Sequence, residues 1–203
     1  MSSQQSLTKQ ETDRIMQISC NTRGEEISGL AENIKKKYGE EGIRKVEEKL
    51  KELGYPTVFS KLQLTGWYPE GLNVLLILLS KEILGWTNEE IFEMGRKIPQ
   101  LFFITKMFIK YFVSVKKTFD ASNQYWRKFM TCGELEPFKF NEKEKYAIWR
   151  LKDYSFHPTM CFYLGGYFLG VAEIIIRSEK ITMEETACVH RGDPYHEYTM
   201  HWV

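Results

Sequence analysis

The C-terminal stretch constrains the fold most strongly, because it consists of two β-rich runs joined by a tight reversal. The runs are 181–189 and 195–202, and the sequence HRGDP lies between them. Gly, Asp and Pro together are typical of a turn, so the two runs predict an antiparallel hairpin. With the turn centred on Gly192, Cys188 stands opposite His196, and opposed side chains on one face of a sheet lie about 5 Å apart.

A thiol and an imidazole placed in this way suit a tetrahedral metal ion such as zinc. Glu185 precedes Cys188 by three residues, and Cys161 opens the helix before the hairpin. These residues are therefore candidate metal ligands together with His196. In a regular strand the side chains of Glu185 and Cys188 point to opposite faces. A bulge or a late start of the strand would bring them to one face, and otherwise Glu184 could take the place of Glu185.

The rest of the chain changes from helical to alternating periodicity. Residues 1–23 have no apolar periodicity and predict a flexible tail. Apolar residues at helical spacing then predict a series of helices over 25–37, 41–53, 69–84, 88–97, 100–116 and 119–130. Alternation at 138–141 and 146–151 predicts a second hairpin, and a helix over 158–178 separates the two hairpins.

This order of elements predicts an α+β fold, with an N-terminal helical bundle packed on a C-terminal antiparallel sheet of hairpin-helix-hairpin type. We expect one domain over 24–203, with a helical part at 24–133 and a ββαββ part at 134–203. The hydrophobic content of 43% is ample for a core, and the net charge of +1 gives no argument for binding nucleic acid. The longest apolar run, at 74–79, is far shorter than the ~20 residues of a spanning helix. We therefore expect a cytoplasmic protein with neither nucleic acid nor membrane as a partner.

The helix over 158–178 carries Gly165, Gly166 and Gly170. A glycine within a helix costs roughly 1 kcal/mol relative to alanine, so these positions suit close approach of another backbone or of a ligand. With nearby aromatic residues they predict an apolar pocket, although the same aromatics would also suit an ordinary core. The predicted lining residues are Phe108, Phe112, Trp149, Phe162, Tyr163, Gly166, Tyr167 and Phe168.

The C-terminal half resembles the 4-vinyl-reductase or hydrocarbon-binding domain family, which occurs in the sensor halves of aromatic-responsive transcription activators. The resemblance rests on CFYLGGYFLG from Cys161, on Glu185-x-x-Cys188, and on Cys188-x7-His196 around the HRGDP turn. The same superfamily includes the haem-nitric-oxide/oxygen-binding (H-NOX) domains and the vesicle-tethering TRAPP subunits. In the aromatic-responsive sensors, zinc is held by a cysteine at the helix start, a glutamate, a cysteine three residues later and a further cysteine. The resemblance thus implies a structural zinc on Cys161, Glu185, Cys188 and His196, with histidine in place of the last cysteine and one extra residue between Cys161 and Cys188.

The resemblance implies a non-haem member of the superfamily. An H-NOX domain needs a proximal histidine on a helix in the middle of the chain and a Tyr-x-Ser-x-Arg motif. Every histidine here lies at 157 or later, and the closest match to the motif, DYSFH at 153–157, has no arginine. The cofactor expectation is therefore zinc and no haem.

For function, the resemblance implies a sensor or binding domain for a small hydrophobic or aromatic molecule, which forms a homodimer and signals through a partner protein. The sequence contains no glycine-rich nucleotide loop, Gly-x-Ser-x-Gly elbow or His-Glu-x-x-His, so we expect no enzyme activity. The alternative is a protein-interaction adaptor that resembles the TRAPP subunits and binds no ligand. A cavity of ligand size favours the sensor, whereas a solid core with a large exposed apolar patch favours the adaptor.

Overall fold

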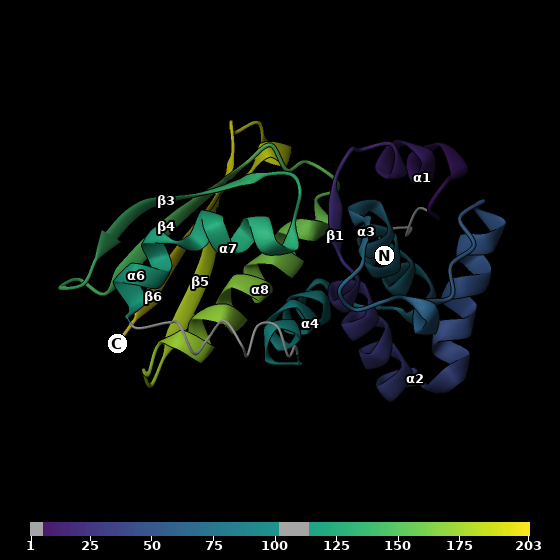
Figure 1. Ribbon diagram of the computed structural model, residues 1–203, viewed down its shortest axis with the longest axis horizontal. Coiled ribbons are helices and arrows are strands. Elements are labelled where there is room, and N and C mark those ends of the chain that lie inside the picture. Colours follow the sequence, from purple (N-terminus) through teal and green to yellow (C-terminus); the bar gives the residue numbers. More distant parts are fainter. Residues whose placement is uncertain (1–5, 102–113) are drawn as a thin grey trace. The chain divides into compact units, whose positions relative to one another are not determined.

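The structure is a computed structural model, and it describes residues 6–101 and 114–203. The chain divides into two compact units, Met1–Asn88 and Glu89–Val203 (Figure 1). Helices dominate the N-terminal part, and an antiparallel sheet dominates the C-terminal part. The predicted α+β class is therefore confirmed.

The first unit is built around one buried helix. Its elements are α1 (Lys9–Met16), β1 (Asn21–Arg23), α2 (Gly24–Glu52), the 3-10 turn η1 (Phe59–Lys61), β2 (Trp67–Pro69) and α3 (Glu70–Leu84). The helix α3 is apolar on almost every side, and both α1 and α2 pack against it. It ends at Gly85, which adopts the left-handed conformation with φ 71°.

A glycine divides α2 into two helical stretches, in agreement with the two helices that were predicted there. Gly39, with φ 73° and ψ −175°, interrupts the helical backbone between the predicted spans 25–37 and 41–53. Only glycine adopts such angles without strain, so the chain bends there and continues as helix on both sides.

Residues 1–23 were predicted as a flexible tail, and the structure differs. The side chain of Thr8 caps α1 by accepting a hydrogen bond from the Glu11 N–H, and Ile15 is fully buried. Strand β1 then pairs with β2, which ties this segment to the first unit. The tail prediction failed because a helix of eight residues presents too few apolar positions for a clear period. The first compact unit ends at Asn88.

The second unit is a four-stranded antiparallel sheet with helices. Its helices are α4 (Asn88–Leu101), α6 (Val115–Asp120), α7 (Ser122–Phe129) and α8 (Thr159–Ile175). The strands β3 (Glu134–Asn141), β4 (Tyr146–Lys152), β5 (Ile181–Ala187) and β6 (His196–Trp202) lie in the order β3-β4-β6-β5. Both predicted hairpins are present, with α8 between them along the chain (Figure 1). Most of the predicted helix over 100–116 lies outside the described residues.

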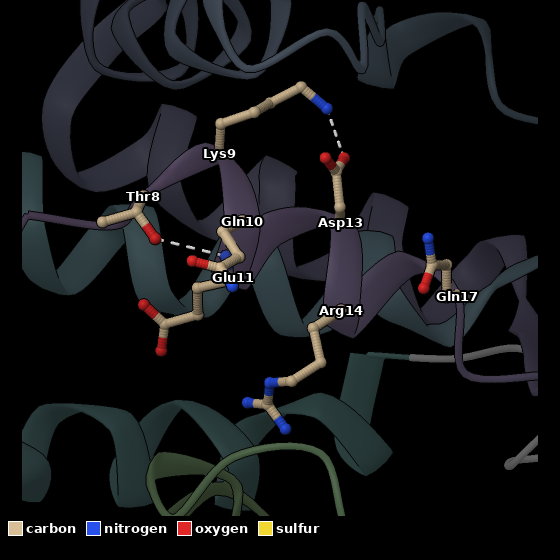
Figure 2. Close-up of a pocket in the computed structure, with 7 residues that line it drawn as sticks. All are labelled: Thr8, Lys9, Gln10, Glu11, Asp13, Arg14 and Gln17. Carbon is tan, nitrogen blue, oxygen red and sulfur yellow. Dashed lines mark hydrogen bonds and ion pairs between the residues drawn. The ribbon is translucent and has the colours of Figure 1, made fainter.

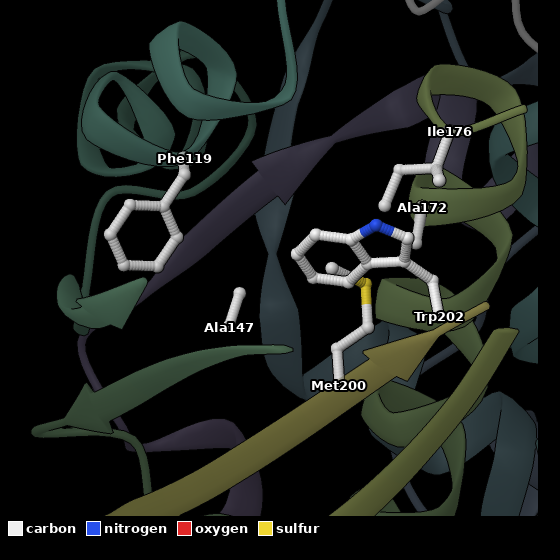
Figure 3. Packing of buried hydrophobic residues seen from close by; sticks show 6 residues of the cluster. All are labelled: Phe119, Ala147, Ala172, Ile176, Met200 and Trp202. Atoms are coloured by element: carbon white, nitrogen blue, oxygen red, sulfur yellow. The ribbon is translucent and has the colours of Figure 1, made fainter. Parts of the chain in front are cut away.

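Alternate residues of the sheet face the helices and form the core of the second unit. Met200 and Trp202 of β6 lie beside Ala147 of β4, and Phe119 of α6 and Ala172 of α8 contribute to the same cluster (Figure 3). Because side chains alternate along a strand, this inward face of β6 also includes His196 and Tyr198. Among the described residues, no helix combines the length and the apolar character needed to span a membrane.

Candidate functional site

The structure brings together the four candidate metal ligands. Cys161 lies in the first turn of α8, Glu185 lies in β5, Cys188 follows β5, and His196 begins β6. The ligand atoms of these side chains all lie within 4.8 Å of one another. The two sulfur atoms are 3.4 Å apart, Cys161 Sγ is 3.8 Å from His196 Nδ1, and His196 Nδ1 is 2.9 Å from Glu185 Oε1. A tetrahedron with metal–ligand bonds of 2.0–2.3 Å has edges of about 3.3–3.8 Å, so the four atoms are close to the arrangement that an ion requires.

A β-bulge places Glu185 on the same face as Cys188. Glu185 pairs with Tyr198, but Ala187 pairs with Glu197, so the register shifts by one residue at Thr186. The extra residue reverses the alternation of side chains in the residues that follow it. The side chain of Cys188 therefore points to the same face as that of Glu185. The structure brings Glu185 to the cluster, whereas Glu184 is exposed on the other face of the strand.

The HRGDP turn closes the cluster on one side. The backbone N–H of Cys188 donates a hydrogen bond to Asp193 Oδ2 at 2.8 Å, and the backbone N–H of Asp193 donates to the Cys188 carbonyl at 3.2 Å. Gly192 adopts φ 96°, which lets the chain reverse. Arg191 Nη1 lies 3.5 Å from Glu185 Oε2. The turn thus holds Cys188 in place and sets a positive charge beside the Glu185 carboxylate.

The imidazole of His196 is oriented for binding through Nδ1. Its Nε2 lies 3.0 Å from the backbone carbonyl oxygen of Tyr154, and a carbonyl can only accept a hydrogen bond. The proton therefore resides on Nε2, and Nδ1 faces Glu185 and Cys161. Metal-binding histidines in proteins commonly donate their second N–H to a carbonyl in this way.

The charges in the cluster favour a cation. Burial raises the pKa of the Cys161 thiol, and the neighbouring Glu185 carboxylate and Cys188 raise it further. Burial also acts to raise the pKa of Glu185, but hydrogen bonds with His196 and Cys161 and the charge of Arg191 outweigh it, so this pKa is lowered. An ionised carboxylate thus lies beside a thiol that resists ionisation. A bound cation would relieve this conflict by stabilising the thiolates.

Several contributors to the cluster were not predicted from the sequence. These are the Tyr154 carbonyl, Asp193, Arg191 and Tyr198. Tyr198 lies two residues after His196 in one strand, and that spacing alone could have placed it on the same face. The Tyr154 carbonyl carried no sequence signal, because any residue supplies one.

The glycines of α8 allow another helix to pack closely against it. A Cβ atom on Gly166 would lie 1.9 Å from the Phe92 carbonyl oxygen of α4, and one on Gly170 would lie 2.1 Å from the Arg96 carbonyl oxygen. On the α4 side, Gly95 meets the Tyr163 carbonyl oxygen of α8 in the same manner, at 2.1 Å. We call this contact the glycine seam. The prediction that Gly166 borders a ligand cavity is therefore corrected, because backbone of α4 occupies the space beside it.

The predicted aromatic lining residues are spread over several places. The ring of Phe168 packs against Tyr198 at 4.9 Å, and that of Trp149 packs against Phe119 at 5.1 Å. Tyr163 is buried, Tyr167 is half-buried and Phe162 is exposed. Phe108 and Phe112 lie outside the described residues. A ligand cavity lined by these aromatics stays a prediction.

A hollow in the described structure lies along α1 and differs in character from the predicted apolar pocket. Polar and charged residues line it (Figure 2): Thr8, Lys9, Gln10, Glu11, Asp13, Arg14 and Gln17. Lys9 forms an ion pair with Asp13 one turn later. The hollow is open, and its lining does not suit a hydrophobic molecule.

No protein-family model matches this sequence, and no curated protein matches it. Among solved structures, an H-NOX protein from S. oneidensis in the Fe(II)NO ligation state aligns with a TM-score of 0.66 at 14% identity, over 89% of this chain and 99% of that chain. The fold is that of the H-NOX domains. An NMR structure of an H-NOX domain from Shewanella oneidensis in the Fe(II)CO state has the same TM-score of 0.66 at 12% identity, over 89% and 98% of the two chains. A structure from work on haem distortion in the H-NOX family aligns with a TM-score of 0.60 at 15% identity, over 89% and 94%.

The comparisons show an H-NOX-like fold, while membership of the superfamily and the closer resemblance to the 4-vinyl-reductase domains stay predictions. They contradict the cofactor expectation of zinc and no haem. The H-NOX structures that share this fold are described by the haem and Fe(II) ligation states that they contain. The cofactor of these neighbours is haem and not zinc.

Proposed function

We propose that this chain is a small-molecule sensor domain of the H-NOX fold, with a metal-ion site formed by Cys161, Glu185, Cys188 and His196. The likeness to H-NOX structures, solved with bound nitric oxide and in work on H-NOX activation, supports the sensor role. The convergence of four ligand atoms within 4.8 Å supports the metal site. Two sulfurs, one nitrogen and one oxygen suit several transition-metal ions, and the proposal assigns none of them.

The ion would have a structural role and would not take part in a reaction. Four protein ligands leave no open position for a substrate or a water molecule. Cys161 lies at the start of α8, and the other three ligands lie in or beside the C-terminal hairpin. An ion held by all four would therefore fasten α8 to the hairpin.

Haem is the group implied by the fold, and the histidines of this chain do not fit its axial position. No histidine precedes His157 in the sequence. His157 Nδ1 accepts a hydrogen bond from the Thr159 N–H at 3.1 Å, and both ring nitrogens of His196 are engaged in the cluster. His190 and His201 are exposed. No step of the proposed function is derived through haem.

Reconstitution with haemin, followed by reduction, tests the fold's implication directly. A one-to-one complex would require an axial ligand of another type, and cysteine and tyrosine are the established alternatives. Its absorption spectrum before and after exposure to nitric oxide would identify the ligand class. A spectrum typical of histidine-bound haem would show that a histidine of this chain binds haem after all, and it would contradict the argument above.

The ligand class, the partner protein and the homodimer belong to the same proposal. A hydrophobic or aromatic ligand is supported only by the aromatic side chains around α8, of which Phe162 is the most exposed at 41%. Thermal-shift measurements with small aromatic compounds, and with nitric oxide for the haem-loaded protein, test the sensor role. If no compound raises the melting temperature, the sensor proposal loses its support. No observation on the described residues favours the adaptor alternative.

Metal analysis of protein purified without a metal-affinity tag tests the metal site. We expect about one transition-metal ion per chain, and we expect Cys188→Ser and Glu185→Gln to lose it. Glu184→Gln is the matched control, because it removes the neighbouring carboxylate on the exposed face of β5. Wild-type protein that contains no ion after incubation with metal salts, and melts identically with and without a chelator, would refute the site.

A further inference from the structure

Tyr198 is a buried polar residue beside the metal site. It lies on β6 two residues after His196 and is fully buried. It is also the direct cross-strand partner of Glu185. Paired residues on one face of a sheet have Cβ atoms about 5 Å apart, so the phenol and the carboxylate project into the same space.

The ring of Tyr198 is held firmly by its neighbours. It packs against Phe168 at 4.9 Å and stacks on His196 at 6.5 Å. Gly165 of α8 covers it, since a Cβ atom built on that glycine would lie 3.8 Å from Tyr198 Cε1. The ring therefore has little room to move, and the hydroxyl stays in this environment.

This hydroxyl has no hydrogen-bond partner among the described residues. Buried tyrosines usually satisfy their hydroxyl, because an unpaired buried polar group costs about 1–3 kcal/mol. An ordinary tyrosine hydroxyl is protonated at neutral pH, so Tyr198 can donate a hydrogen bond to an acceptor on its cross-strand partner Glu185.

Two other side chains contact the Glu185 carboxylate. His196 Nδ1 lies 2.9 Å from Glu185 Oε1, and Arg191 Nη1 lies 3.5 Å from Oε2. An ion that takes His196 Nδ1 and one Glu185 oxygen as ligands replaces the direct contact between these two atoms. The carboxylate is then free to turn, and its second oxygen needs a donor to hold it.

We propose that Tyr198 is a positioning residue of the metal site, whose hydroxyl donates a hydrogen bond to the non-ligating oxygen of Glu185 when an ion binds. The carboxylate is thereby held as a ligand through one oxygen, and the ion keeps four ligands. Without the hydroxyl, both Glu185 oxygens can reach the ion, and its coordination number rises to five. This inference rests on the proposed metal site.

Cobalt(II) titration of the full chain tests the inference, because four-coordinate cobalt(II) absorbs visible light more strongly than five-coordinate cobalt(II). For Tyr198→Phe we expect 10–100-fold weaker binding in competition with a chelator, as is typical for loss of an outer-shell partner, together with weaker visible absorption. The metal-free variant should melt at or above the temperature of the wild type, because deleting a buried hydroxyl that has no partner removes an unfavourable contribution to stability. Tyr163→Phe, which deletes a hydroxyl from a buried tyrosine of α8, is the matched control and should change neither the affinity nor the spectrum.

The outcomes separate this inference from the proposal on which it rests. If the wild type binds cobalt(II) and Tyr198→Phe binds it with equal affinity and the same spectrum, the positioning role is wrong and the metal site stands. If the wild type binds no cobalt(II), both are wrong.

Discussion

The first turn and the middle of helix α8 make contacts of opposite kinds. At its first turn it presents Cys161 to a polar cluster in which ligand atoms from three elements converge. Along its middle, Gly166 and Gly170 present no side chain at all, and backbone atoms of α4 fill the space. The sequence suggested binding at both places, but the geometry supports it only at the first. Clustered ligand-type side chains point to a specific chemistry, whereas a glycine is equally compatible with a ligand and with a neighbouring helix.

The largest expected effect is at the glycine seam. Gly166→Ala should destabilise the protein by about 3 kcal/mol or more, because its Cβ atom would lie 1.9 Å from the Phe92 carbonyl oxygen and the two helices must separate. Gly165→Ala is the matched control in the same helix. Its Cβ atom would lie 3.4 Å from the nearest atom of the Phe92 ring, and the gain in helix propensity of up to about 1 kcal/mol should leave stability unchanged or higher.

Urea denaturation of the two variants measures the difference in their free energies of unfolding. Equal stability of Gly165→Ala and Gly166→Ala would show that the helices of the seam are not in firm contact. The space beside Gly166 would then be open to a ligand after all.

A carboxyl group in the first unit offers a contrast to Glu185. Glu25, in the first turn of α2, is buried, and no partner for its Oε1 is found among the described residues. Burial raises its pKa from 4.5 to about 7, although the charge of Arg23 acts in the opposite direction. Between these two values the folded protein binds more protons than the unfolded chain, so stability should fall as the pH rises from 4.5 through 7.

Glu25→Gln should remove that pH dependence and raise stability at pH 8 by on the order of 2 kcal/mol. Thermal melting between pH 4.5 and pH 8 measures the effect. Glu48→Gln, which removes an exposed carboxylate of the same helix, should leave the slope in place. A wild-type melting temperature that rises over this pH range would contradict the expected loss of stability.

The smallest effect concerns the ion pair at the end of the glycine seam. Arg96 of α4 contacts Glu173 of α8 through two nitrogens, with Nε 3.0 Å from both carboxylate oxygens. Glu173→Gln should cost about 1 kcal/mol, because a two-point contact is stronger than an ordinary surface pair. Asp120→Asn, which breaks the exposed pair with Lys116, should cost almost nothing.

Repeating both measurements in high salt sharpens the comparison. The effect of Glu173→Gln should shrink as salt screens the pair. If the two substitutions have equal effects at low salt, the ion pair does not help to hold the seam.

The sequence predicted most elements near their observed limits. The apolar run of α3, the hairpin of β3 and β4, and the hairpin around HRGDP all follow from hydrophobic periodicity and turn residues, which act over a few neighbouring positions. One error came from a segment where the local pattern is weak, because the helix at 9–16 is too short to show a period.

The sequence by itself also determined which residues could bind a metal ion, because only a few side-chain types have suitable donor atoms. Tertiary structure alone decided that Cys161 of α8 meets the hairpin, that a bulge at Thr186 selects Glu185 over Glu184, and that the Tyr154 carbonyl orients His196. It also decided that the backbone of α4 lies beside Gly166. The physical reason is that these outcomes depend on backbone atoms and on contacts between distant segments. Backbone atoms are the same in every residue, so a sequence does not distinguish them until the chain has folded.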